Sequence, residues 1–268
     1  MLWNTARIFS AGAFRGGGFL VDVDGHRYLV APHHVARDET TIEAALPNAF
    51  SGRLHDPIPV IDWEYPFEGV DLMYARLSGP QRPSHSVDLH RQITPDTEPN
   101  LGAELFYVGT FALPGELLLP MARSGTLGSP PVQIVKEPTR ENPNRYEYQA
   151  NLVDCRSYDG FSGSPCYAVL QYANLSHAAE MPVEPPREAA EHDLYELASL
   201  AVLVGMFTAH YDDEGSAAAS RYGIGLMLPA SMIWEALMSE SEEAKRAGID
   251  AANDLTRQLV NTPKRSDE

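Results

Sequence analysis

Short apolar segments separated by glycine and proline run through most of this chain, and this pattern most limits its fold. The 268 residues include 20 glycines and 21 prolines, residues that mark turns and interrupt helices. The clearest unit is a hairpin in which Phe19–Val23 and Arg27–Val30 flank the dipeptide Asp24–Gly25, a signal for a tight two-residue turn. Further strand candidates are Leu105–Val108, Tyr146–Ala150, Ala201–Phe207 and Gly225–Leu228. The pattern predicts an all-β fold.

The C-terminal part has a different pattern, with apolar residues three and four positions apart, which indicates a helix. We expect Ser231 to be its N-cap residue. The helix is expected to continue through the charged segment that follows, to be interrupted at Gly248, and to resume to about Val260. The apolar positions with this spacing are Ile233, Trp234, Leu237 and Met238.

Charge and cysteine content exclude several function classes. The formal net charge is −17, which disfavours nucleic acid or an anionic membrane surface as a partner. The chain has two cysteines, Cys155 and Cys166, without the spacing of metal ligands. We expect both thiols to be free and buried, as in a reducing compartment, and we expect no metal or other cofactor.

The start of the chain lacks a secretory pattern, and no apolar run reaches the roughly 18 residues that span a bilayer. These features favour a cytoplasmic protein.

The segment with the most chemical content is Gly160–Pro165, which places Ser162 between two glycines. A serine hydroxyl is a weak nucleophile until a general base activates it. The oxyanion that forms on attack needs nearby backbone N–H groups, and flanking glycines allow the tight turn that exposes them. Most serines between glycines only form turns, so a catalytic role requires partners elsewhere in the chain.

Candidate partners lie upstream. His33 and His34 follow an apolar segment, and Asp71 precedes another. Either type of residue alone is more often structural, since an aspartate before an apolar run commonly starts a strand. The combined order of histidine, aspartate and serine favours nucleophilic catalysis with a histidine base.

This order of motifs resembles that of the chymotrypsin-like serine peptidases, especially the bacterial high-temperature-requirement type without a PDZ domain. The resemblance covers about residues 5 to 235. The matching segments are Gly16–Val21, Leu29–Val35, Asp71–Leu77, Gly160–Pro165, Leu203–Met206 and Gly223–Pro229.

The resemblance implies two six-stranded antiparallel β-barrels packed side by side, followed by a C-terminal helical extension. It implies a serine endopeptidase with Ser162 as nucleophile, His34 as general base and Asp71 as the group that orients the imidazole. His34 is preferred to His33 because the family's histidine directly precedes a valine. The backbone amides of Gly160 and Ser162 would form the oxyanion hole.

Three positions depart from the family. Phe161 stands where relatives usually carry Asp or Asn, so we expect the packing of its ring to hold the serine loop. Arg156 stands at the base of the expected specificity pocket, and Gly205 and Phe207 are expected to line that pocket. A guanidinium at this base would disfavour Lys and Arg, although it could instead face solvent or pair with Asp154. We therefore expect cleavage after small or acidic residues.

The same reading divides the chain into residues 1–90 for the first barrel, 91–230 for the second, and 231–268 for the C-terminal helix and tail. Residues 173–197 form a proline- and glutamate-rich insertion, whose composition is typical of a surface loop. This insertion or the C-terminal helix could bind a regulatory partner. For the C-terminal helix, the preferred interpretation is that it packs on its own domain.

Two alternatives stay open. The first is a chymotrypsin-like domain that does not cleave and serves as a binding module or scaffold, which the unusual Arg156, Phe161 and Phe207 would suit. The second is an esterase-type serine hydrolase of the α/β class. That class needs a second glycine two residues after the serine, but this chain has Ser164 there, and no helical pattern follows.

Overall fold

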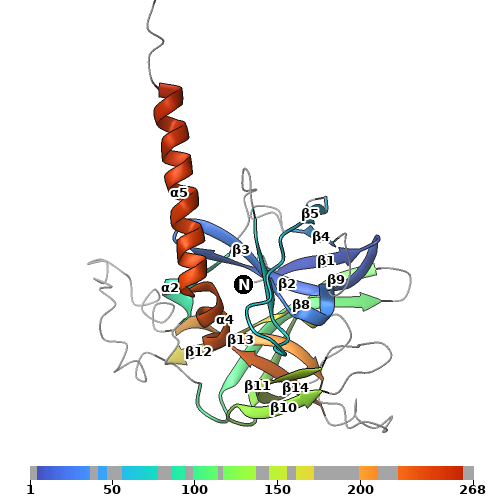
Figure 1. Cartoon of the computed structure of the whole chain (residues 1–268). Coiled ribbons are helices and arrows are strands. Elements are labelled where there is room, and N and C mark those ends of the chain that lie inside the picture. The colour runs from blue at the N-terminus through green and yellow to red at the C-terminus, as the bar shows by residue number, and fades with distance from the viewer. Residues whose placement is uncertain are drawn as a thin grey trace, which may run out of the picture.

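The structure is a computed structural model, and two antiparallel β-sheets followed by two helices make up most of it (Figure 1). The all-β prediction with a C-terminal helical extension is confirmed. The structure describes residues 5–36, 42–46, 56–77, 86–93, 99–113, 117–136, 145–155, 161–171, 199–210 and 223–261.

The first sheet closes into a barrel. Its strands follow the order β5-β4-β1-β2-β3-β6, and a backbone bridge between Glu64 and Tyr74 joins the segment after β5 to β6. The predicted hairpin is present, with Asp24 and Gly25 both at positive φ (50° and 81°), as a two-residue turn between twisted strands requires. A short strand, β7 (Val87–Asp88), adds parallel to β2. The six barrel strands are β1 (Thr5–Ser10), β2 (Ala13–Val23), β3 (His26–Ala31), β4 (Ile42–Ala45), β5 (Ile58–Val60) and β6 (Met73–Arg76).

The second sheet also closes. The order β11-β14-β13-β12-β8-β9 returns to its start because β9 pairs with β11, and β10 pairs with β11 outside the ring. Each sheet thus contains six strands that close on themselves, with one further strand attached. The strands are β8 (Glu104–Leu113), β9 (Leu117–Leu127), β10 (Val132–Lys136), β11 (Tyr146–Asp154), β12 (Pro165–Gln171), β13 (Ser199–His210) and β14 (Ile224–Pro229).

The largest hydrophobic cluster joins the two barrels and the first C-terminal helix. It includes Phe19 from the first barrel, Tyr148 and Leu228 from the second, and Ile233 and Leu237 from the helix, all buried. Full burial of a large apolar side chain contributes about 1.5–3 kcal/mol, so this shared cluster favours one fixed arrangement of the barrels.

Two helices, α4 (Ala230–Leu237) and α5 (Glu240–Asn261), form the C-terminal part. Two details of the sequence prediction are wrong. The N-cap residue is Pro229, without a side-chain capping bond, and not Ser231. The helical segment is interrupted between α4 and α5, at Met238–Ser239, and passes through Gly248 unbroken. One glycine in a helix costs only about 1 kcal/mol, which does not end a helix of this length.

The apolar stripe on α4 is as predicted, since Ile233 and Leu237 are buried. Two four-residue helices, α1 (His33–Ala36) and α2 (Leu89–Gln92), complete the described elements. Within the described part of the chain, no helix has the length and apolar character to cross a membrane.

Candidate active site

His34 and Asp71 meet at one end of the first barrel. Strands β3 and β6 are neighbours that pair Ala31 with Met73, so the turn after β3 and the segment before β6 lie together. The Asp71 carboxylate binds His34 twice, with Oδ2 2.8 Å from Nδ1 and Oδ1 accepting the backbone N–H at 2.9 Å. The aspartate side chain is 2% exposed, whereas that of the histidine is 27% exposed. This arrangement fixes the imidazole through Nδ1 and leaves Nε2 for a reacting group.

The neighbouring His33 has different surroundings. Its ring lies 4.4 Å from that of Tyr65, and its Nδ1 lies 3.5 Å from the Tyr146 hydroxyl. Of the two adjacent histidines, the carboxylate Asp71 contacts His34.

The serine turn is held by main-chain hydrogen bonds. The N–H of Gly163 donates to the Phe207 carbonyl, and the N–H of Phe207 donates to the Ser164 carbonyl, both at 2.8 Å. Gly163 has φ +86°, and a Cβ there would lie 1.9 Å from the Gly17 carbonyl oxygen. Only glycine fits this position, so the second glycine of the motif is explained by backbone packing.

The same turn contacts the glycine-rich strand β2 of the first barrel. The Gly17 N–H donates to the Ser162 carbonyl at 2.8 Å. A Cβ on Gly16 would lie 2.8 Å from a Val35 methyl group and 3.4 Å from the Ser162 carbonyl oxygen. Gly16 is therefore adjacent both to the serine turn and to the residue after His34. The absence of side chains at Gly16–Gly18 of β2 allows these two segments to approach each other.

The Ser162 hydroxyl, which is partly exposed, donates to the backbone carbonyl of Thr208 at 3.0 Å. The Thr208 hydroxyl is fully buried, donates to the Leu226 carbonyl at 3.3 Å, and lies 3.2 Å from the Tyr148 hydroxyl. Because the threonine has one proton, the tyrosine is the donor in the second contact. Burial, followed by the nearby Asp71 charge, raises the pKa of Tyr148, so the phenol stays neutral.

Thr208 and Tyr148 were not among the residues singled out from the sequence. They lie on β13 and β11, and no local motif connects them to Ser162 or Asp71. A buried threonine directly after an apolar run carries no signal that separates it from an ordinary strand residue.

The Phe161 ring is fully buried and meets Tyr107 edge to face, with ring centroids 5.6 Å apart. Apolar packing thus holds this residue, as the sequence predicts. Phe207 requires a correction. It is 1% exposed and stacks on Tyr107 at 5.4 Å, so its ring lies in the barrel interior and not at the mouth of a pocket.

Gly205 is also buried within the second barrel, where a Cβ would lie 2.4 Å from the Leu228 carbonyl oxygen. Its lack of a side chain there allows the close approach of β13 to β14. Two predicted site residues, Arg156 and Gly160, lie outside the described residues, as does the 173–197 insertion.

The two cysteines are free and buried. Burial raises the pKa of Cys155 to about 11, which keeps the thiol protonated. Among the described residues, no group of histidine, cysteine, aspartate or glutamate side chains is arranged to hold a metal ion.

Comparison with known proteins supports the fold. No protein-family model and no curated protein matches the sequence. Solved structures do match. The Rv3671c protease from M. tuberculosis, in its active form, has a TM-score of 0.52 and 14% identity over 87% of this chain and 79% of its own. The MamO protease domain from Magnetospirillum magneticum, in its apo form, has a TM-score of 0.54 and 15% identity over 87% of this chain and 94% of its own. The chain therefore has the double-barrel fold of trypsin-like serine proteases.

Proposed function

We propose that this protein is a serine endopeptidase that uses Ser162, His34 and Asp71. The observation that carries this proposal is the doubly hydrogen-bonded His34–Asp71 pair, in which a buried carboxylate binds both the ring and the backbone of one partly exposed histidine. The fold shared with two solved proteases adds to it. A pair of this kind orients an imidazole and stabilises its protonated form during catalysis.

In the proposed reaction the Ser162 oxygen attacks the scissile carbonyl carbon, and its proton passes to Nε2 of His34. The imidazolium then gives this proton to the leaving amine as the peptide C–N bond breaks, which leaves an acyl-enzyme. Water, deprotonated by the same histidine, hydrolyses the ester. Ser162 donates to the Thr208 carbonyl in this structure, so its side chain must rotate toward His34 before attack.

The oxyanion would be stabilised by the backbone N–H groups of Gly160 and Ser162. The glycine lies outside the described residues, so this part of the proposal rests on the motif. The rigid backbone of the turn, fixed through Gly163 and Gly17, supports it because preorganised donors contribute most to this kind of catalysis.

The substrate main chain would lie along β13. This strand pairs with β12 as far as Met206, whereas its pairing with β14 continues to His210. The stretch from Thr208 to His210 thus extends beyond β12 on the side of the serine turn, and an extended peptide can add to such a strand. We expect cleavage after acidic residues in preference to Lys or Arg, because a guanidinium at Arg156 would disfavour a basic side chain.

The free thiols fit a reducing compartment, in agreement with a cytoplasmic location. We also propose domain limits of 1–90, 91–230 and 231–268, which the separate strand sets of the two sheets support.

The test is cleavage of a mixed peptide pool by the full chain and by Ser162→Ala. If the template holds, the substitution lowers kcat by about six orders of magnitude. Cleavage by the variant at a near-wild-type rate would contradict the assignment of the nucleophile. A dominant preference for Lys or Arg would contradict the expected specificity.

One observation favours a second candidate, a domain of the same fold that binds peptides without cleaving them. The Ser162 hydroxyl contacts a backbone carbonyl, Thr208 O, which cannot act as its base. If the pool is bound but left uncleaved by the wild-type chain, this second candidate is favoured. The α/β-hydrolase alternative is excluded by the fold, since both sheets are antiparallel apart from the short β7 pairing.

A further inference from the structure

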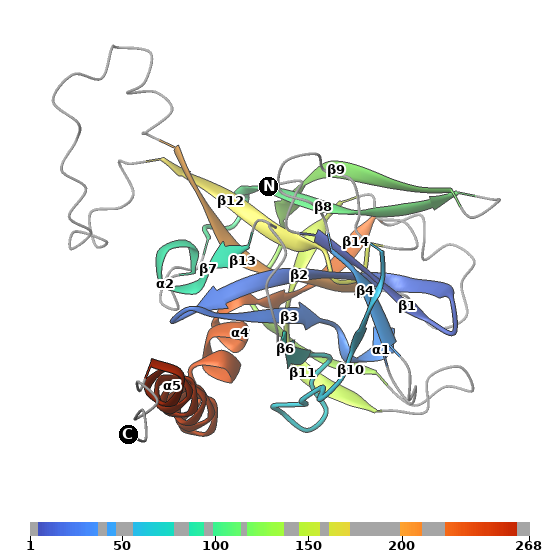
Figure 2. The same ribbon diagram turned by 90° about the horizontal axis from the view of Figure 1, so that it is seen from above.

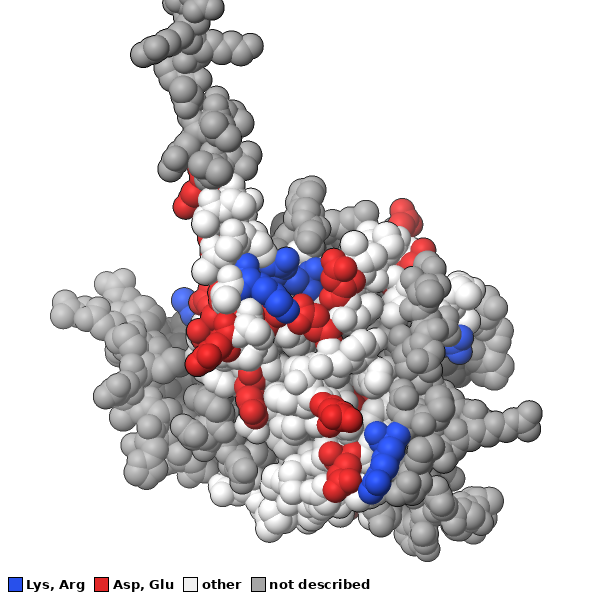
Figure 3. Space-filling model, viewed as in Figure 1, with Lys and Arg blue, Asp and Glu red and all other residues white. Residues whose placement is uncertain are grey.

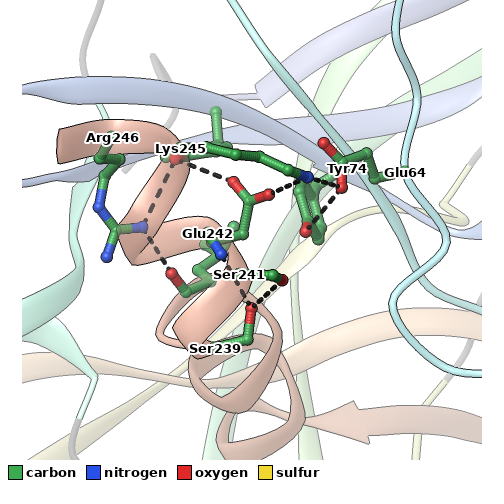
Figure 4. Close-up of polar contacts among 9 residues, drawn as sticks. Glu64, Tyr74, Ser239, Ser241, Glu242, Lys245 and Arg246 are labelled. Carbon is green, nitrogen blue, oxygen red and sulfur yellow. Dashed lines mark hydrogen bonds and ion pairs between the residues drawn. The ribbon is translucent and has the colours of Figure 1, made fainter. Parts of the chain in front are cut away.

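The C-terminal helix α5 contacts the first barrel through a cluster of charged and tyrosine side chains (Figure 4). Glu242 is 2% exposed, and its carboxylate accepts from the Tyr28 hydroxyl at 3.2 Å and from Lys245 Nζ at 2.7 Å. Lys245 Nζ also donates to Glu64 Oε2, which accepts from the Tyr74 hydroxyl at 3.4 Å. This cluster therefore joins the helix to the barrel at two places, one at Tyr28 and one at Glu64 and Tyr74.

Both tyrosines lie on strands that lead to the proposed active site. Tyr28 is on β3, which runs directly into the turn that carries His34. Tyr74 is on β6, three residues after Asp71. The two strands are paired, and the tyrosine rings meet edge to face with centroids 5.8 Å apart. A contact that fixes the two tyrosines thus fixes the strands that bring His34 and Asp71 together.

The other end of this connection is anchored on the second barrel. Ile233 and Leu237 of α4 lie in the hydrophobic cluster that includes residues of that barrel. Arg246 of α5 is 4% exposed and donates from Nη1 to the Leu237 carbonyl at 2.7 Å. A guanidinium at a helix C-terminus binds its free carbonyls, so Arg246 connects α5 to the C-terminal end of α4.

The figures agree with a contact between the C-terminal helices and the first barrel. In Figure 2 the tip of the β2–β3 hairpin points toward α4 and α5, and His26 and Asp24 of that hairpin contact Asp250 and Arg246. In Figure 3 basic and acidic side chains meet at the base of the C-terminal helix. The rest of α5 extends beyond both barrels (Figure 1).

We propose that Glu242 is a positioning residue, and that through it α5 acts as a clasp that holds β3 and β6 together and so keeps His34 in register with Asp71. The clasp is defined by Tyr28, Glu64, Tyr74, Glu242 and Lys245. Its link to catalysis rests on the proposed peptidase function, whereas its effect on the two strands does not.

Glu242 is the charged group that accepts hydrogen bonds from two other members of the clasp, Tyr28 and Lys245. Burial alone would raise the pKa of this carboxyl, but the hydrogen bond and charge of Lys245, together with the tyrosine hydroxyls, outweigh burial and lower the pKa. The residue is therefore charged at neutral pH. Removing it leaves the buried Tyr28 hydroxyl without its acceptor, which is more costly than the loss of one exposed contact. The exposed Lys245 would still donate to Glu64.

The test compares Glu242→Ala with Glu243→Ala in the full chain. Glu243 is exposed on the same turn of α5, so its substitution changes the same charge and helix propensity without touching the clasp. Amide hydrogen exchange is measured in peptides covering β3 with the His34 turn and β6, and in β8 and β12 as an internal reference. We expect Glu242→Ala to accelerate exchange in β3 and β6 about tenfold or more, a size typical of mutations that change coupling between sites. The reference strands and the Glu243→Ala variant should be unchanged.

A second readout reports on the pair itself. The Nδ1 proton of His34, bonded to Asp71, should give a low-field proton resonance that broadens or shifts in Glu242→Ala and not in Glu243→Ala. If Glu242→Ala folds poorly, Glu242→Gln keeps the size of the side chain and should give a smaller change of the same kind. Unchanged exchange in β3 and β6 together with an unchanged resonance would overturn the proposal. Neither measurement requires activity, so a chain that cleaves no peptide would contradict the proposed function and leave the clasp intact.

Discussion

The two halves of the proposed active site are held in different ways. In the first barrel a buried carboxylate fixes His34 through its ring and its backbone N–H. In the second barrel the turn around Ser162 is fixed by main-chain bonds that involve Gly17, Gly163 and Phe207. The position of His34 therefore depends on one side chain, that of Asp71. The position of the serine turn depends on the absence of side chains at Gly17 and Gly163. The difference predicts that the two halves respond to different kinds of substitution.

The largest effect should come from the histidine half. Asp71→Asn removes the charge that stabilises the imidazolium and allows the ring to take the wrong tautomer, so kcat should fall by about four orders of magnitude. His33→Ala is the matched control, because His33 is adjacent and contacts Tyr65 and Tyr146 instead. The measurement is the peptide cleavage rate of both variants. If both variants lost the same fraction of the cleavage rate, Asp71 would not act specifically through His34. The proposed difference between the two halves of the site would then be wrong.

The serine half should fail through its backbone. Gly163→Ala places a methyl group 1.9 Å from the Gly17 carbonyl oxygen, so the turn must move. A displacement of about 1 Å costs about a hundredfold in rate. Gly12→Ala is the control, since Gly12 also has positive φ (+77°) but faces open space. It tests backbone strain without the collision, and it should leave the cleavage rate unchanged. A similar loss in both variants would show that strain and not packing is responsible.

The smallest effect should come from a side-chain contact inside the second barrel, behind the serine half. Thr208→Val removes the hydroxyl that accepts from Tyr148, and a buried hydrogen bond of this kind contributes about 1 kcal/mol. Tyr148→Phe should cost a similar amount, and the double variant should cost less than the sum because the two groups share one bond. Urea unfolding of the four proteins measures this directly. Strictly additive losses would mean that the two side chains act independently.

The sequence was most informative where local backbone chemistry decides the structure. Asp24–Gly25 gave the hairpin turn, and Gly163 gave the tight serine turn, because each position needs a conformation or a space that only a few residues allow. The side-chain network was not predictable in this way. Thr208 and Tyr148 become neighbours only when β13 and β11 are brought together by the closed barrel.

The predicted position of Phe207 at the mouth of the pocket was wrong. The prediction took the position of Phe207 from the resemblance to relatives that carry a small residue there, and such a resemblance does not show where a larger ring packs. The pairing of β13 with β14 is regular as far as Phe207, opposite Met227. The ring packs on Tyr107 in the barrel interior.

The central claim is that Ser162 is activated by His34, and reaction with a fluorophosphonate tests it most directly. Such a reagent forms a covalent phosphonyl ester only with an activated serine, and mass spectrometry of the digested protein locates the adduct. We expect an adduct on Ser162 in the wild-type chain, a much slower reaction in His34→Ala, and none in Ser162→Ala. An unlabelled wild-type chain, or an adduct on another residue, would contradict it.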